Sequence, residues 1–204
     1  MSEIARLIDQ AIRESIAPTL KAHGFRKDGR NFRRREPNCV WIVNVQASAW
    51  NSKDEGQFTI NLGMHFPALV PFIPWLRDTD RPLEQGCLVR TRIGHLLPAG
   101  GDYWWELRAS DDRADRTADL RRSVTEFALP WLEKHTDLRE ARNWVLTRFR
   151  NHWWAAAISL ALHDRPSSVE ELSRALSEVD PSSDQSRMLL SWGQQHGVLP
   201  KDAR

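Results

Sequence analysis

The sequence predicts an α+β fold, in which a mainly antiparallel five-stranded sheet carries helices on one face and is followed by an all-helical extension. Apolar residues recur at three- and four-residue steps near the N-terminus. They then alternate with polar residues in several segments between residues 31 and 108, and they return to helical spacing beyond residue 137. A sheet whose apolar face is covered by helices makes a two-layer domain. We therefore expect an α+β domain at residues 1–136 and a helical extension at residues 137–204.

The composition indicates a chain that folds without covalent or metal support. It has 204 residues, 41% of them apolar, and a chain of this length buries enough surface to form its own core. Its two cysteines, Cys39 and Cys87, are too few for a disulfide framework or a zinc site. No uncharged apolar run approaches the ~18 residues of a membrane span, and the charged N-terminal segment does not resemble a secretory signal. We expect a cytoplasmic protein with no cofactor, no metal and no membrane partner, and the oligomeric state stays open.

The first predicted element is a helix that begins near Ser2 and ends at Gly24. Pro18 should kink it, because proline lacks an amide hydrogen and its ring clashes with the preceding turn. Gly24 supplies the left-handed residue that commonly ends a helix. The apolar residues at helical spacing are Ile4, Leu7, Ile8, Ala11, Ile12, Ile16 and Leu20.

After this helix the apolar period changes to two, which indicates strands. The turn Pro37–Asn38 would pair Glu36 with Cys39. A loop centred at residues 53–54 would give the second hairpin a register that places both apolar sets on one face. The expected strands are residues 31–36, 39–50 and 57–66. The expected pairs are Ala49 with Phe58, Val45 with Leu62 and Trp41 with Phe66.

Two further strands and a covering helix complete the predicted domain. The strands, residues 87–93 and 103–108, alternate apolar and polar side chains and are joined by the loop 94–102. Residues 114–131 then show helical spacing, interrupted near Pro130. This second helix can cover the apolar face of the sheet beside the first one.

The extension beyond Asp137 contains only helical patterns. Pro166 and Pro181 should separate successive helices, with Ser167 and Ser182 as their N-terminal caps. The predicted helices are residues 138–149, 151–163, 167–179 and 182–196.

The net charge of +2 is the average of two oppositely charged segments. Residues 26–35, which we call the basic segment, carry six cations against Asp28, and residues 164–184 carry six carboxylates against two arginines. The two segments could attract each other or two different partners. Arginines that neutralise phosphates, beside aromatic rings that stack on bases, make the basic segment a candidate nucleic-acid contact. Alternate arginines on an edge strand also serve to prevent aggregation, which is the simpler interpretation.

The polar face of the predicted sheet is the best candidate site. Alternation places amide and imidazole groups of neighbouring strands on one side of the sheet. Arginines of the preceding strand would add guanidinium groups, whose paired N–H donors suit a carboxylate or a phosphate. The same face could instead contact water, or lie beneath the extension with its hydrogen bonds satisfied. The candidate residues are Arg33, Arg35, Asn44, Gln46, Asn61 and His65.

The sequence contains none of the common catalytic motifs: no phosphate-binding loop, no dinucleotide fingerprint, no zinc-protease motif and no nucleophile elbow. Asp78 and Asp80 could face a divalent cation, but the flanking arginines favour a solvated charge cluster. His163 is expected at a helix C-terminus, where the helix dipole favours a histidine. We assign no catalytic residue and no metal ligand.

Four short motifs follow one another in the first third of the chain. They are Gly24–Lys27, Gly29–Arg34, Val43–Ser48 and Phe58–Gly63. Over roughly Ile12 to His135 the sequence resembles the bacterial family catalogued as domain of unknown function 4304 (DUF4304). The resemblance implies an α+β domain and brings no activity, cofactor or catalytic residue.

Three functions are compatible with these patterns. The first is a non-catalytic protein-binding module, such as an immunity protein or an accessory protein, because exposed Trp and Arg side chains anchor interfaces. The second is a nucleic-acid binder that uses Arg26–Arg35. The third is a small-molecule binder or hydrolase that uses the polar sheet face. The absence of a catalytic motif favours the first.

Overall fold

The computed structural model describes residues 3–52, 55–108 and 113–202, so the expected cap at Ser2 and the expected loop centre at 53–54 lie outside the described residues. The chain forms two compact units. The α+β unit comprises Met1–His65 and Thr79–Lys134, and the helical unit comprises Phe66–Asp78 and His135–Arg204. Among the described residues, no helix is both long and apolar enough to cross a membrane.

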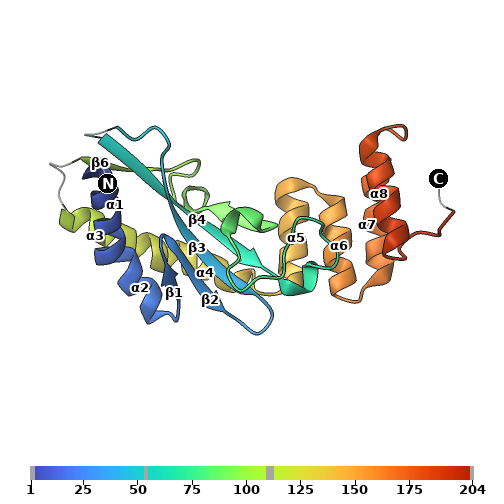
Figure 1. The fold of residues 1–204 in the computed structure, drawn as a ribbon, viewed down its shortest axis with the longest axis horizontal. Coiled ribbons are helices and arrows are strands. Elements are labelled where there is room, and N and C mark those ends of the chain that lie inside the picture. Colours follow the sequence, from blue (N-terminus) through green and yellow to red (C-terminus); the bar gives the residue numbers. More distant parts are fainter. Residues whose placement is uncertain (1–2, 53–54, 109–112, 203–204) are drawn as a thin grey trace. The chain divides into compact units, whose positions relative to one another are not determined.

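The α+β unit contains a six-stranded antiparallel sheet (Figure 1). Five strands are hydrogen-bonded in chain order, and β4 pairs with β3 on one edge and with both β5 and β6 on the other. The strands are β1 (Arg26–Asp28), β2 (Asn31–Arg35), β3 (Val40–Ala47), β4 (Glu55–His65), β5 (Val89–Arg92) and β6 (Trp105–Arg108). This confirms the predicted mainly antiparallel sheet. The additional strand β1 exists because Gly29, at φ +60°, closes a tight turn that pairs Asp28 with Asn31.

The register of the β3–β4 hairpin differs from the expected one by two residues. Phe58 lies opposite Ala47, not Ala49. The reason is Asn51, whose side-chain amide hydrogen-bonds both the N–H and the C=O of Gln57 and so replaces further strand pairing. Because side chains alternate, a two-residue shift keeps each of them on its expected face. In the first hairpin the Glu36 N–H donates to the Cys39 C=O, which confirms the predicted pairing.

Two helical segments cover one face of this sheet. The first is α1 (Glu3–Ala11), η1 (Ile12–Ile16) and α2 (Ala17–Ala22), and the second is α3 (Arg113–Ser123), η5 (Val124–Ala128) and α4 (Leu129–Lys134). Side chains of the first segment and of the covered sheet face are fully buried. They include Ile8, Ile12, Ile16, Leu20, Phe32, Phe58, Ile60, Leu62 and Met64. Each contributes about 1.5–3 kcal/mol to folding through its removal from water.

Pro18 and Pro130 do not interrupt these helices, contrary to the expectation for Pro130. A π turn, η1 or η5, ends two residues before each proline. In both turns the backbone N–H that follows reaches five residues back, from Ala17 to Ile12 and from Leu129 to Val124. The wider turn accommodates the proline ring, which would otherwise clash with the preceding carbonyl. Each proline therefore follows a widened turn inside one helical segment.

The helical unit contains four helices and the segment Phe66–Asp78, which begins with the short helix η2 (Pro67–Leu69). The helices are α5 (Leu138–Phe149), α6 (His152–Ala161), α7 (Arg165–Ser177) and α8 (Asp184–Gln195). The indole N–H of Trp192 on α8 donates to the Phe72 carbonyl at 2.7 Å, and Trp75 meets Trp153 of α6 edge to face. These contacts attach the segment to the helices, although Phe72 and Trp192 are 120 residues apart in sequence.

Two predicted helix caps are wrong, the first by three residues and the second by one. The side chain of Asp164, not Ser167, caps α7 by accepting from the Ser167 N–H, and Pro166 lies in the first turn. Ser183, not Ser182, caps α8. Proline fits the first turn because the amide that it lacks has no partner there.

Candidate binding surfaces

A row of amide side chains crosses the sheet on the face opposite the helices. Asn44 Nδ2 donates to Asn31 Oδ1 at 2.9 Å, and Asn61 Nδ2 donates to Gln46 Oε1 at 2.8 Å and to Asn44 Oδ1 at 3.3 Å. Arg92 Nε donates to Asn61 Oδ1 at 3.3 Å. We call these five residues, from β2, β3, β4 and β5, the amide ladder. The structure thus brings together Asn44, Gln46 and Asn61, as alternation along the strands predicts.

The amide ladder ends in an ionic group at β5. The Arg92 guanidinium lies over the Trp104 ring, 4.9 Å from its centroid, and pairs with Asp102. Hydrogen bonds from Arg92 and Trp104 hold the pKa of Asp102 below its usual value. Asn61, at the centre, is only 5% exposed. The amides therefore satisfy one another, which is how buried polar groups are stabilised.

The remaining predicted site residues lie on the same face but outside the ladder. Arg33 Nε donates to the Pro82 carbonyl at 2.7 Å, and Arg33 also pairs with Asp28. Arg35 pairs with Asp80 at 2.7 Å. His65 is buried. The two arginines therefore do not present a free guanidinium fork beside the amides.

The segment around η3 (Glu84–Gly86) covers this part of the sheet, so it is packed and not an open polar face. A Cβ atom at Gly63 would lie 3.1 Å from Cys87 Sγ and 3.2 Å from Glu84 Cα. Glu84 is buried and accepts from Arg90 Nε at 2.7 Å, and its burial raises the pKa of the carboxyl. Burial also raises the pKa of the Cys87 thiol, and it raises that of Cys39 to about 12. Both thiols are thus protonated and unsuited to act as nucleophiles.

Most cations of the basic segment form ion pairs within the α+β unit. The pairs are Arg30 with Asp9, Arg33 with Asp28, Arg34 with Glu36, and Arg35 with Asp80. Arg34 also lies over the Trp41 ring, 4.5 Å from its centroid. Of the six cations, Arg26 and Lys27 are the two without an ion pair to any described residue.

The β3–β4 hairpin presents a large aromatic side chain to solvent. Trp50 is 94% exposed, whereas Trp75, the next most exposed tryptophan of the described chain, is 43% exposed. Beside Trp50 lies a cleft of about 220 Å³ whose lining includes Gln57, Glu106 and Arg108. The surface formed by Trp50 and this cleft, which we call the hairpin surface, combines an indole, a guanidinium and carboxylates.

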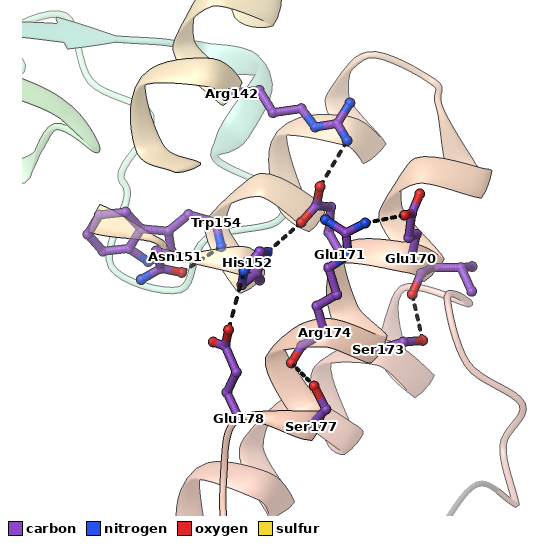
Figure 2. Close-up of polar contacts among 11 residues, drawn as sticks. Arg142, Asn151, His152, Trp154, Glu170, Glu171, Ser173, Arg174, Ser177 and Glu178 are labelled. Carbon is purple, nitrogen blue, oxygen red and sulfur yellow. Dashed lines mark hydrogen bonds and ion pairs between the residues drawn. The ribbon is translucent and has the colours of Figure 1, made fainter. Parts of the chain in front are cut away.

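The helical unit contains a buried ionic network (Figure 2). Glu171 of α7 is 3% exposed and faces two donors from other helices. Its Oε1 lies 3.1 Å from Arg142 Nη2 of α5, and its Oε2 lies 2.6 Å from His152 Nδ1 of α6. His152 Nε2 lies 3.4 Å from Glu178 at the end of α7. Because both imidazole nitrogens face carboxylates, the network holds three helices together and does not present a free base.

Sequence reasoning missed this network. One signal was present, because Glu171 lies three residues after Ser168, one before Leu172 and four before Ala175, all on the buried stripe of α7. A carboxylate in such a stripe requires a partner. Among the described residues, no three His, Cys, Asp or Glu side chains are arranged to hold a metal ion.

The model of the family described as domain of unknown function (DUF4304) matches residues 16–134. This match covers more than half of the chain. The chain belongs to the DUF4304 family. The DUF4304 match includes the whole sheet, the basic segment and the hairpin surface, and it stops before α5, as the predicted resemblance does. No curated protein and no solved structure matches the chain.

Proposed function

We propose that this DUF4304 chain is a non-catalytic protein-interaction module whose contact is the hairpin surface. The observation that carries the proposal is the 94% exposure of Trp50 in a chain that buries most of its aromatic area. A tryptophan side chain buries about 150–250 Å² in an interface. At about 25 cal/mol per Å² this is worth up to about 4–6 kcal/mol, the size of an interface hot spot.

The charged residues beside Trp50 favour one kind of partner for the hairpin surface. Arg108 pairs with Glu55 at 3.5 Å and with Glu106 at 3.9 Å, so a charged rim lies beside the indole. A central aromatic anchor with a polar rim is the usual anatomy of a protein–protein interface. The partner is therefore a protein with an apolar pocket that receives Trp50, as for an immunity or accessory protein.

The test is quantitative capture of partners from the cells that produce the protein. Wild-type protein should recover one partner at near-stoichiometric amounts, and Trp50→Ala should lower its recovery at least about tenfold. Met188→Ala is the matched control, because Met188 is also an exposed apolar side chain but lies on α8. A partner retained in full by Trp50→Ala, or no stoichiometric partner at all, contradicts the proposal.

The two alternative functions have less support. A nucleic-acid contact through Arg26–Arg35 is weakened because four of its six cations already form ion pairs. A small-molecule binder or hydrolase on the polar sheet face is weakened because the ladder amides bond one another and η3 packs over Gly63. Nucleic-acid binding that weakens steeply with salt, and that Arg26→Gln reduces, would favour the first alternative.

A further inference from the structure

An open groove of about 720 Å³ lies in the α+β unit, beside the first helical segment and the β1–β2 turn. Its lining includes four cations, Arg13, Lys21, Lys27 and Arg30, and one carboxylate, Asp9. The volume lies in the range of small-ligand sites, about 300–1,000 Å³. The groove is separate from the hairpin surface, since the two share no lining residue.

Three of the groove cations are available to a ligand. Arg30 is fixed by Asp9 at 2.9 Å and by the Ala5 carbonyl at 3.4 Å. Arg13, Lys21 and Lys27, by contrast, make no side-chain hydrogen bond or ion pair with any residue that the structure describes. Ammonium and guanidinium groups are donors without acceptor capacity, so only an acceptor, best an anion, satisfies them.

The π turn helps to place two of these cations in one groove. Arg13 and Lys21 are eight residues apart, and in an α-helix of 3.6 residues per turn their directions differ by about 80°. The π turn η1 takes one more residue into a turn, because the Ala17 N–H reaches back to Ile12. This extra residue offsets part of the difference. Both side chains line the groove, and Pro18, which follows the π turn, lines it between them.

Strand alternation places the third cation. Lys27 pairs with Phe32, whose side chain is buried in the core beneath the helices, so Lys27 points to the helical side. Its neighbour Arg26 pairs with Arg33 and points to the opposite face. Arg26 is also exposed and is not part of the groove lining. The chain thus offers two adjacent cations, one inside the site and one outside.

We propose that this groove binds a phosphate-bearing ligand with at least two negative charges. Phosphate oxygens accept several charge-assisted hydrogen bonds at once, which suits one guanidinium and two ammonium groups on two walls. Gly29 leaves the mouth open, since a Cβ atom there would meet nothing within 4 Å. The phosphate belongs either to a small phosphorylated molecule or to a nucleic-acid backbone.

The test is isothermal titration calorimetry of the full chain at low salt, with inorganic tripolyphosphate and with a single-stranded deoxythymidine decamer as the two probes. Arg13→Gln, Lys21→Gln and Lys27→Gln should each weaken binding about threefold to tenfold, because each removes charge-assisted hydrogen bonds. Arg26→Gln should leave the tripolyphosphate affinity unchanged. Tighter binding of tripolyphosphate identifies a small phosphorylated ligand, and tighter, steeply salt-dependent binding of the decamer identifies a nucleic-acid backbone.

Two results would overturn the proposal. One is the absence of binding to either probe, and the other is a loss in Arg26→Gln as large as in Lys27→Gln, which would indicate only a diffuse positive field. Pro18→Ala tests the alignment without removing a charge. It should weaken tripolyphosphate binding while circular dichroism shows an intact fold, and an unchanged affinity would show that Pro18 is not needed for the alignment. Trp50→Ala should not alter phosphate binding, so this proposal and the proposed function fail independently.

Discussion

Substitution of Glu171 tests the buried network of the helical unit most directly. Glu171→Gln keeps the volume of the side chain but removes the negative charge that both Arg142 and His152 face. Removing one partner of a buried ion pair costs about 3–5 kcal/mol. Because Arg142 and His152 are 23% and 16% exposed and recover some hydration, we expect a loss at or just below the lower end of this range, about 2–3 kcal/mol.

The neighbouring residue provides the control. Glu170 forms an exposed i,i+4 pair with Arg174, and such pairs contribute about 0.3–0.5 kcal/mol, so Glu170→Gln should have little effect. Urea unfolding followed by circular dichroism gives the free energies, and amide hydrogen exchange in α6 and α7 shows whether the loss is local. A Glu171→Gln protein no less stable than Glu170→Gln would refute the structural role of the network.

Three further predictions concern packing, thiols and pH. Gly63→Ala should destabilise the α+β unit by about 1–3 kcal/mol in urea unfolding, because its Cβ would crowd Cys87 Sγ and the Glu84 backbone. Cys39 and Cys87 should react with iodoacetamide in the native protein far more slowly than in urea, since both are buried and their pKa values are raised; equal rates would contradict this. Burial lowers the pKa of His196 from its ordinary 6.5, so the unfolded chain binds the proton more readily and stability should fall as pH drops below about 6.5. His196→Gln should reduce that slope in urea unfolding measured across this pH range.

The faces of the sheet could be predicted from the sequence, whereas the register could not. Alternation alone decides which side of a strand a side chain occupies, and this placed Asn44, Gln46 and Asn61 together. The register depended on Asn51, whose side chain bonds the Gln57 backbone in place of a strand residue. Such a bond is one of several that an asparagine can make in a loop, so the pattern does not reveal it.

The polar contacts of the candidate sites were harder to predict than their positions. Arg30 and Arg35 pair with Asp9 and Asp80, which lie 21 and 45 residues away in sequence. Only the folded chain brings these charges together. The run of arginines in the sequence therefore suggested more guanidinium groups free to bind a ligand than the structure offers. Pro130 misled for a related reason, because the local sequence does not show whether a helix is interrupted at a proline or continues through a widened turn.

The pairing of β4 has a consequence for how the chain could be divided. β5 and β6 attach to separate halves of the same edge of β4, at Asn61–Met64 and at Glu55–Phe58. Between them the chain passes Gly100 and Gly101, which are exposed and adopt positive φ. A cleavage there would break no strand pairing, so two fragments that meet at these glycines should reassemble as a split protein. Gly100–Gly101 is therefore also a place at which new chain termini or an inserted reporter domain would leave the strand pairing of β4 with β5 and β6 intact.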